Sequence, residues 1–121
     1  MSKLILVIED QEDNRRIVRD LLTSAGYEII EALTGEEGVI AAEKHRPKLI
    51  LMDIQLPDFD GYEATRRLKA NPVLSSIPII AITSYALSGD DVKAYEAGCD
   101  AYVSKPFSPR ALLAKIREFV P

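Results

Sequence analysis

Residues 49–61 read L-I-L-M-D-I-Q-L-P-D-F-D-G. Four apolar residues lead directly into Asp53, and Pro57, two further acids and Gly61 follow it. A continuous apolar run of this kind is typical of a strand that helices cover on both faces. An ionised carboxylate at the end of such a strand is costly unless another group counters its charge. Both the fold and the function therefore depend on what surrounds Asp53.

The rest of the chain alternates short apolar runs with longer amphipathic segments. The spacing predicts strands over residues 4–8, 28–32, 49–52, 79–82 and 101–104, and helices over residues 14–25, 34–44, 61–70, 89–97 and 108–120. Such repeated alternation of strand and helix indicates an open parallel sheet with helices on both faces and right-handed connections. We therefore predict an α/β, doubly wound fold that forms one domain over residues 1–121.

Capping residues support several of these helix ends. Thr34, with Glu37 three residues later, matches the capping-box pattern at the start of the second helix. Asp13 is a candidate N-cap for the first helix, and Ser108 is a candidate N-cap for the last. Gly98 follows the fourth helix, where a glycine commonly ends a helix.

Composition narrows the class of protein. The chain has 121 residues, of which 47% are hydrophobic and 28% charged, as one globular domain would. Its formal net charge of −4 disfavours direct binding to nucleic acid or to anionic lipid. The one cysteine, Cys99, excludes an intramolecular disulfide and fits a reducing compartment. No run approaches the roughly 18 apolar residues of a membrane span, and we expect a cytoplasmic protein.

Polar residues follow four of the five predicted strands. Glu9 and Asp10 follow the first strand, Asp53 the third, Thr83 the fourth and Lys105 the fifth. Each alone could be a turn or capping residue. In a parallel α/β sheet, however, ligands bind beyond the carboxyl ends of the strands, and these residues are all predicted to lie at that edge.

This set of residue types suits phosphoryl transfer to a side chain. Carboxylates held close together repel one another, so that one takes a proton or a cation lies between them. Their hard oxygen atoms suit Mg²⁺, which prefers one or two carboxylates together with a phosphate oxygen. A carboxylate beside such a metal can act as a nucleophile and form an aspartyl phosphate. Lys105 and the hydroxyl of Thr83 can then bind the phosphoryl oxygens.

The sequence resembles the receiver domain of two-component response regulators over residues 4–120. The motifs that carry the resemblance are I-E-D after the first strand, L-M-D-I-Q-L-P with D-G downstream, I-T-S after the fourth strand, and Y-V-S-K-P-F around the end of the fifth. The resemblance implies a flavodoxin-like (βα)5 fold with strand order 2-1-3-4-5. The M-D-I-Q-L-P segment resembles stand-alone cell-division and polar-differentiation receivers, and also receivers fused to hybrid kinases.

The resemblance implies roles for the residues around the third strand. Asp53 is expected to be the phosphoacceptor and a ligand of Mg²⁺, for which Mn²⁺ is expected to substitute. Asp10 is expected to bind the metal directly, Glu9 through water, and Gln55 through its backbone carbonyl. Gln55 and Tyr85 occupy positions that in this family tune how fast the phosphate is lost.

The resemblance also implies how phosphorylation changes the protein. Thr83 is expected to be the switch hydroxyl, and Tyr102 the aromatic side chain that turns inward behind it. Lys105 is expected to bind the phosphate, with a cis peptide bond between Lys105 and Pro106 that aims it.

These roles predict a phosphorylation-dependent signalling switch. A histidine kinase or histidine phosphotransfer protein would donate the phosphoryl group, and a downstream protein would read the result. The domain would be a signalling protein and not an enzyme, either a monomer or a dimer that forms on phosphorylation. Because the last predicted helix reaches the C-terminus, we expect no output domain.

Other functions fit the residues less well. An FMN site would need phosphate-binding donors after the first strand, where E-D-Q-E-D-N carries four acids. An aspartate-nucleophile phosphohydrolase would need an acid at position 55, which is Gln55. A calcium loop with Gly61 at its sixth position would place Leu56 first and Arg67 last, which are not ligands. A receiver that serves as an unphosphorylated scaffold remains the other possibility.

Some residues have two readings. Arg15, Arg16 and Arg19 form a basic cluster on the first helix, either a solvated face or, as in related receivers, a docking surface for phosphoryl donors. We expect His45 to be a helix-end cation and not a phosphorelay histidine, and Cys99 to be a packing residue between the fourth helix and the fifth strand.

Overall fold

A computed structural model describes residues 3–83, 90–105 and 108–121. Its strands are β1 (Leu4–Ile8), β2 (Glu28–Ala32), β3 (Leu49–Asp53), β4 (Ile79–Thr83) and β5 (Ala101–Ser104), and its helices are α1 (Glu12–Ser24), α2 (Gly35–His45), α3 (Gly61–Ala70), α4 (Asp90–Ala97) and α5 (Pro109–Phe119). The strands form one parallel sheet in the order β2-β1-β3-β4-β5, which confirms the predicted α/β fold and topology. Within these residues, no helix has the length and apolar character that crossing a membrane requires.

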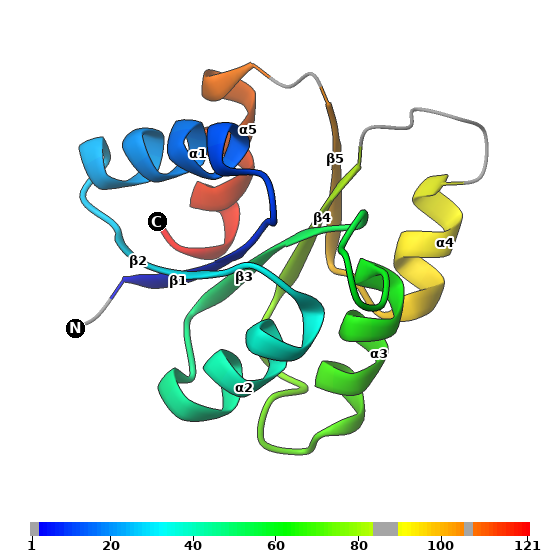
Figure 1. Ribbon diagram of the computed structural model, residues 1–121. Helices are drawn as coiled ribbons and strands as arrows, with labels where there is room; N and C mark the ends of the chain where they lie inside the picture. Colours follow the sequence, from blue (N-terminus) through cyan, green and yellow to red (C-terminus); the bar gives the residue numbers. More distant parts are fainter. Residues whose placement is uncertain (1–2, 84–89, 106–107) are drawn as a thin grey trace.

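Two layers of helices enclose the sheet. Figure 1 shows α1 and α5 on one face of the sheet and α2, α3 and α4 on the other. Along β1, Ile5 and Val7 pack into the core beneath α1 and α5, whereas Leu6 and Ile8 pack into the core beneath α2, α3 and α4. Burial on both faces explains why the central strands read as continuous apolar runs and not as alternating ones.

Two strands extend one residue beyond their predicted ends. β3 includes Asp53 and β4 includes Thr83, so both polar residues belong to the sheet itself. Asp53 is paired with Ile82 on β4, and the backbone amide of Ile54 still donates to the carbonyl of Ile82 at 3.0 Å. The ladder of hydrogen bonds therefore fixes the position of Asp53.

The predicted helix caps are mostly confirmed. The hydroxyl of Thr34 accepts a hydrogen bond from the amide of Glu37 at 3.0 Å, and that of Ser108 accepts one from the amide of Ala111 at 2.9 Å. Gly98 follows α4 with a φ of 111°, a left-handed conformation that glycine adopts without strain.

The predicted start of the first helix is wrong. α1 begins at Glu12 and not at residue 14, and its N-cap is Gln11 and not Asp13. The amide of Gln11 donates to a carboxylate oxygen of Glu9 at 3.2 Å, so Glu9 supplies an acceptor just before the helix. Asp13 instead lies in the first turn, where a carboxylate interacts favourably with the helix dipole.

The D-F-D-G segment after β3 anchors two helices. The carboxylate of Asp58 accepts hydrogen bonds from the amides of Gly35 and Glu36 at 2.9 Å each, at the N-terminus of α2. Asp60 is the N-cap of α3 and accepts from the amide of Glu63 at 2.9 Å. Both acids therefore serve as helix caps, which holds the segment that follows Asp53 against two neighbouring helices.

Gly61 allows α3 to begin directly against the end of β3. A Cβ atom at this position would lie 2.5 Å from the carbonyl oxygen of Asp53 and 2.8 Å from the Cα of Ile54. We expect Gly61→Ala to lower the free energy of unfolding by about 1–3 kcal/mol, because backbone atoms must move to relieve the overlap. Urea unfolding followed by circular dichroism measures this, and an unchanged midpoint would contradict the close approach.

Candidate functional site

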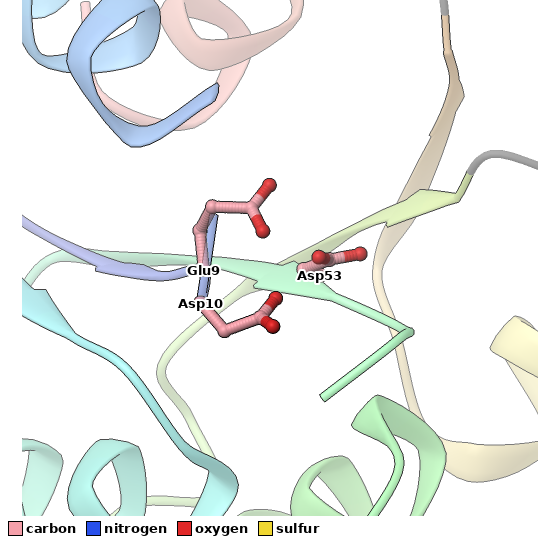
Figure 2. Close-up of side chains that lie close together, drawn as sticks. All are labelled: Glu9, Asp10 and Asp53. Atoms are coloured by element: carbon pink, nitrogen blue, oxygen red, sulfur yellow. The ribbon is translucent and has the colours of Figure 1, made fainter. Parts of the chain in front are cut away.

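Three carboxylates meet at the carboxyl edge of the sheet. Glu9 and Asp10 directly follow β1, and Asp53 is the last residue of β3, the neighbour of β1. One carboxylate oxygen from each lies within 4.8 Å of the others. Figure 2 shows Glu9 and Asp10 leaving the end of β1 on either side of it, with Asp53 beside them. Glu9 and Asp53 are buried, with 5% and 4% of their surface exposed, whereas Asp10 is exposed.

Lys105 supplies positive charge to this cluster. Its Nζ lies 3.1 Å from Oε1 of Glu9 and 3.7 Å from Oδ1 of Asp53. The backbone amide of Lys105 donates to the carbonyl of Thr83 at 2.6 Å, which holds the residue at the end of β4. An ammonium group between two buried carboxylates offsets part of the cost of removing them from water.

The neighbouring carboxyl groups of Glu9 and Asp53 have pKa values shifted in opposite directions. Burial, together with the hydrogen bond and the charge of Glu9, raises the pKa of Asp53 to about 7. Burial acts in the same direction on Glu9, but hydrogen bonds with Asp53, Gln11 and Lys105 and the charge of Lys105 together outweigh it and lower the pKa of Glu9. Below about pH 7 the pair therefore holds one proton, and the raised pKa of Asp53 favours that residue as its site.

The residues around the cluster fit a magnesium ion. All three side chains offer hard oxygen ligands, and the exposure of Asp10 leaves room for the waters that Mg²⁺ retains. Gln55 lines a pocket together with Asp10, Asp53 and Lys105, and its backbone amide donates to Oδ1 of Asp53 at 3.2 Å. Burial, the hydrogen bond with Glu9 and the charge of Glu9 raise the pKa of Asp53, and a divalent cation would counter the negative charge in place of the proton.

The remaining predicted residues lie on the two strands beyond β3 or outside the described ranges. Thr83 is buried at the end of β4, one residue beyond the partner of Asp53. Tyr102 on β5 is half-buried and packs against the core beneath α2, α3 and α4. Tyr85 and the Lys105–Pro106 peptide bond, for which a tuning role and a cis geometry were predicted, fall outside the described residues.

The basic cluster on α1 divides into two kinds of residue. Arg15 and Arg19 both form ion pairs with Glu31 on β2, at 3.3 Å and 3.2 Å. Arg16 has 58% of its side chain exposed and forms an ion pair with Glu12 of its own helix at 3.7 Å. The sequence does not show which of these arginines pair with Glu31, because that depends on how α1 crosses β2. A docking role for this face stays a prediction.

Two further expectations concern residues outside the acidic cluster. His45 lies in the last turn of α2, which confirms its predicted position at a helix end. Cys99 is buried between α4 and β5, as predicted, and its Sγ also lies 3.6 Å from the hydroxyl of Thr65 on α3.

Comparison with known proteins agrees with this geometry. Residues 5–117 match the response regulator receiver domain family. Over 120 residues the chain is 42% identical to the polar-differentiation response regulator DivK of Brucella anthropi, with 99% of this chain and 98% of the relative covered.

Solved structures of receiver domains are also similar to this chain. A CheY-like receiver domain protein from Methanospirillum hungatei is 35% identical with a TM-score of 0.90, and the match covers 98% of this chain and 93% of that one. The receiver domain of a sensor histidine kinase from Pseudomonas aeruginosa is 36% identical with a TM-score of 0.91, over 99% and 98% of the two chains. That crystal structure has a magnesium ion coordinated in the active-site cleft.

The raised pKa of Asp53 predicts a pH-dependent effect of removing its charge. The folded-state pKa of about 7 exceeds the usual value near 4, so the folded protein binds this proton more tightly than the unfolded chain does. Stability from this group is therefore lost as pH rises from about 4 to about 7. Without divalent metal, we expect Asp53→Asn to be more stable than the wild type at pH 8, and its advantage to be smaller at pH 5 by on the order of 2 kcal/mol.

Urea unfolding in EDTA at the two pH values measures this difference. Asp20→Asn, which removes an exposed carboxylate from α1, is the matched control for the loss of one negative charge. A stabilisation of Asp53→Asn that is equal at both pH values would contradict the assigned pKa.

Proposed function

The chain belongs to the response regulator receiver domain family, and from this premise we propose that it is a phosphorylation-dependent switch in which Asp53 accepts the phosphoryl group. Phosphorelay signalling is the general function of the family, and its members are signalling proteins that interact with kinases and downstream targets. The observation that carries the proposal is the position of Asp53, which is buried at the end of β3 beside two other carboxylates and one lysine.

The chemical step is transfer of a phosphoryl group to a carboxylate oxygen. Ionised Asp53 attacks the phosphorus of a phosphohistidine, a P–O bond forms, and the P–N bond of the donor breaks. The imidazole leaves with the bonding electron pair and takes a proton from solvent. Attack of water on the phosphorus later releases inorganic phosphate and restores the carboxylate. The domain turns over no independent substrate, so we class it as a signalling protein and not as an enzyme.

A magnesium ion would be held by the carboxylates at this edge. Asp10 and Asp53 would bind it directly, Glu9 through water, and Gln55 through its backbone carbonyl, with Mn²⁺ able to substitute. When bound, the cation offsets negative charge on the oxygens of the phosphoryl group. Lys105 already lies within 3.7 Å of Asp53, so it can bind the oxygens of a phosphoryl group attached there.

The output of the switch would be a changed protein surface. Thr83 would donate to the new phosphoryl oxygens, Tyr102 would turn further inward, and the face formed by α4, β5 and α5 would bind a downstream protein. The donor would be a histidine kinase or a histidine phosphotransfer protein. A cytoplasmic location and dimer formation on phosphorylation stay predictions.

Phosphorylation of Asp53 can be tested with acetyl phosphate as the donor. With Mg²⁺ present, we expect intact-mass spectrometry to detect one added phosphoryl group that is stable in acid and labile in base, because it is an acyl phosphate. Asp53→Asn should lose the adduct, and Asp20→Asn should keep it. No adduct on the wild type, or an undiminished adduct on Asp53→Asn, would leave the unphosphorylated scaffold as the better interpretation.

Lys105 should affect the phosphoryl group more than the metal. Lys105→Ala removes positive charge from the carboxylates, so Mg²⁺ should bind at least as tightly as it does to the wild type. Loss of the ammonium group should slow formation of the adduct by on the order of 100-fold. Calorimetric Mg²⁺ titration and the time course of the mass gain measure the two effects. Abolished Mg²⁺ binding would contradict the role assigned to Lys105.

A further inference from the structure

Arg15 links strand β2 to the Glu9–Asp10 segment, which carries two of the three carboxylates. One guanidinium nitrogen, Nη1, donates to the backbone carbonyl of Glu9 at 3.2 Å and to that of Asp10 at 3.4 Å. The Nε atom of the same side chain lies 3.3 Å from Oε1 of Glu31. Only 14% of the Arg15 side chain is exposed, in contrast to 58% for Arg16, its neighbour on α1.

The Glu9–Asp10 segment needs such support because it lies beyond the end of β1. The amide of Glu9 donates to the carbonyl of Ala32 at 3.0 Å, which is the last backbone bond between this segment and β2 that the structure records. The carbonyls of Glu9 and Asp10 both face Arg15, so one rigid planar group sets the orientation of two successive peptide units. The direction of the two carboxylates follows from the orientation of these peptides.

Glu31 fixes the other end of the guanidinium group. Its Oε1 also accepts a hydrogen bond from Nε of Arg19 at 3.2 Å, so two arginines of α1 hold it. The path from β2 to the carboxylate cluster is therefore continuous: Glu31 binds Arg15, and Arg15 binds the peptide carbonyls of Glu9 and Asp10.

We propose that Arg15 is a positioning residue for the metal-binding carboxylates, acting through the backbone of Glu9 and Asp10, and that Glu31 holds Arg15 in place. This inference rests on the proposed function, because it assigns a role relative to the metal that the cluster would bind. Arg15 contacts neither the metal nor the phosphoryl group, and it acts by fixing the geometry of the residues that do.

Charge and geometry predict opposite effects at this position, which makes the proposal testable. If Arg15 acted only as a nearby positive charge, its removal would make the cluster more negative and would tighten the binding of Mg²⁺. If Arg15 positions the ligands, its removal weakens binding. Arg15→Lys separates the two effects further, because it keeps the charge but loses the planar fork that spans the carbonyls and Glu31.

The test is Mg²⁺ titration by calorimetry of the wild type, Arg15→Gln, Arg15→Lys and Glu31→Gln. We expect Mg²⁺ to bind about tenfold or more weakly to Arg15→Gln, and several-fold more weakly to Arg15→Lys and Glu31→Gln, as for other residues that orient metal ligands. Arg16→Gln is the matched control, since it removes the same charge from the adjacent exposed position, and it should change affinity less than about twofold.

A second readout distinguishes positioning from general destabilisation. Adduct formation from acetyl phosphate should recover in Arg15→Gln when Mg²⁺ is raised in proportion to the loss of affinity, because the nucleophile Asp53 is unchanged. If Arg15→Gln does not fold, as judged by circular dichroism in EDTA, Arg15→Lys and Glu31→Gln carry the test.

Each outcome has a distinct meaning. Tighter Mg²⁺ binding by Arg15→Gln, or wild-type affinity in both Arg15→Lys and Glu31→Gln, would overturn the positioning role and leave the proposed function intact. Absence of Mg²⁺ binding by the wild type itself would overturn the metal site, and with it both proposals.

Discussion

Repulsion between the buried carboxylates of Glu9 and Asp53 is the constraint around which this edge of the sheet is built. The two groups arrive from adjacent strands, β1 and β3, and share one ammonium group, that of Lys105 from the end of β5. Removing like charges from water together is unfavourable, and it raises the pKa of Asp53 to about 7. The arrangement persists because strands with continuous apolar cores on both faces hold these residues at fixed positions.

Rigidity extends beyond the strands to the loops around the cluster. Asp58 binds the first amides of α2, and Asp60 caps α3, so the chain that leaves Asp53 is attached to two helices within a few residues. On the other side of the cluster, Arg15 attaches the chain that leaves β1 to Glu31. The ligands proposed for the metal therefore lie on segments held at both ends, which is what a site of defined geometry requires.

The sequence predicts the sheet and the identity of its polar edge because both depend on local patterns. Apolar runs mark the strands, and parallel strands place their following residues at one edge, so Glu9, Asp10 and Asp53 could be assigned together. Contacts between segments far apart in the chain could not be predicted from local sequence patterns. The pairing of Asp58 with α2, and of Arg15 with Glu31, depends on how helices and loops cross the sheet. α1 begins at Glu12, earlier than predicted. Glu9 accepts a hydrogen bond from the amide of Gln11 just before the helix, and this contact matches no capping pattern that can be recognised in the sequence.

Lys105 and Arg15 are both cations in contact with this cluster, but they bind different groups. Lys105 contacts carboxylate oxygens, so negative charge added at Asp53 competes directly for its ammonium group. Arg15 contacts peptide carbonyls and the distant carboxylate of Glu31, whose charges do not change when Asp53 is modified. A change of charge at Asp53 would therefore act directly on the contacts of Lys105, whereas the contacts of Arg15 involve no group whose charge would change. In the proposed switch, Lys105 would respond to phosphorylation while Arg15 would hold the backbone of Glu9 and Asp10 in place.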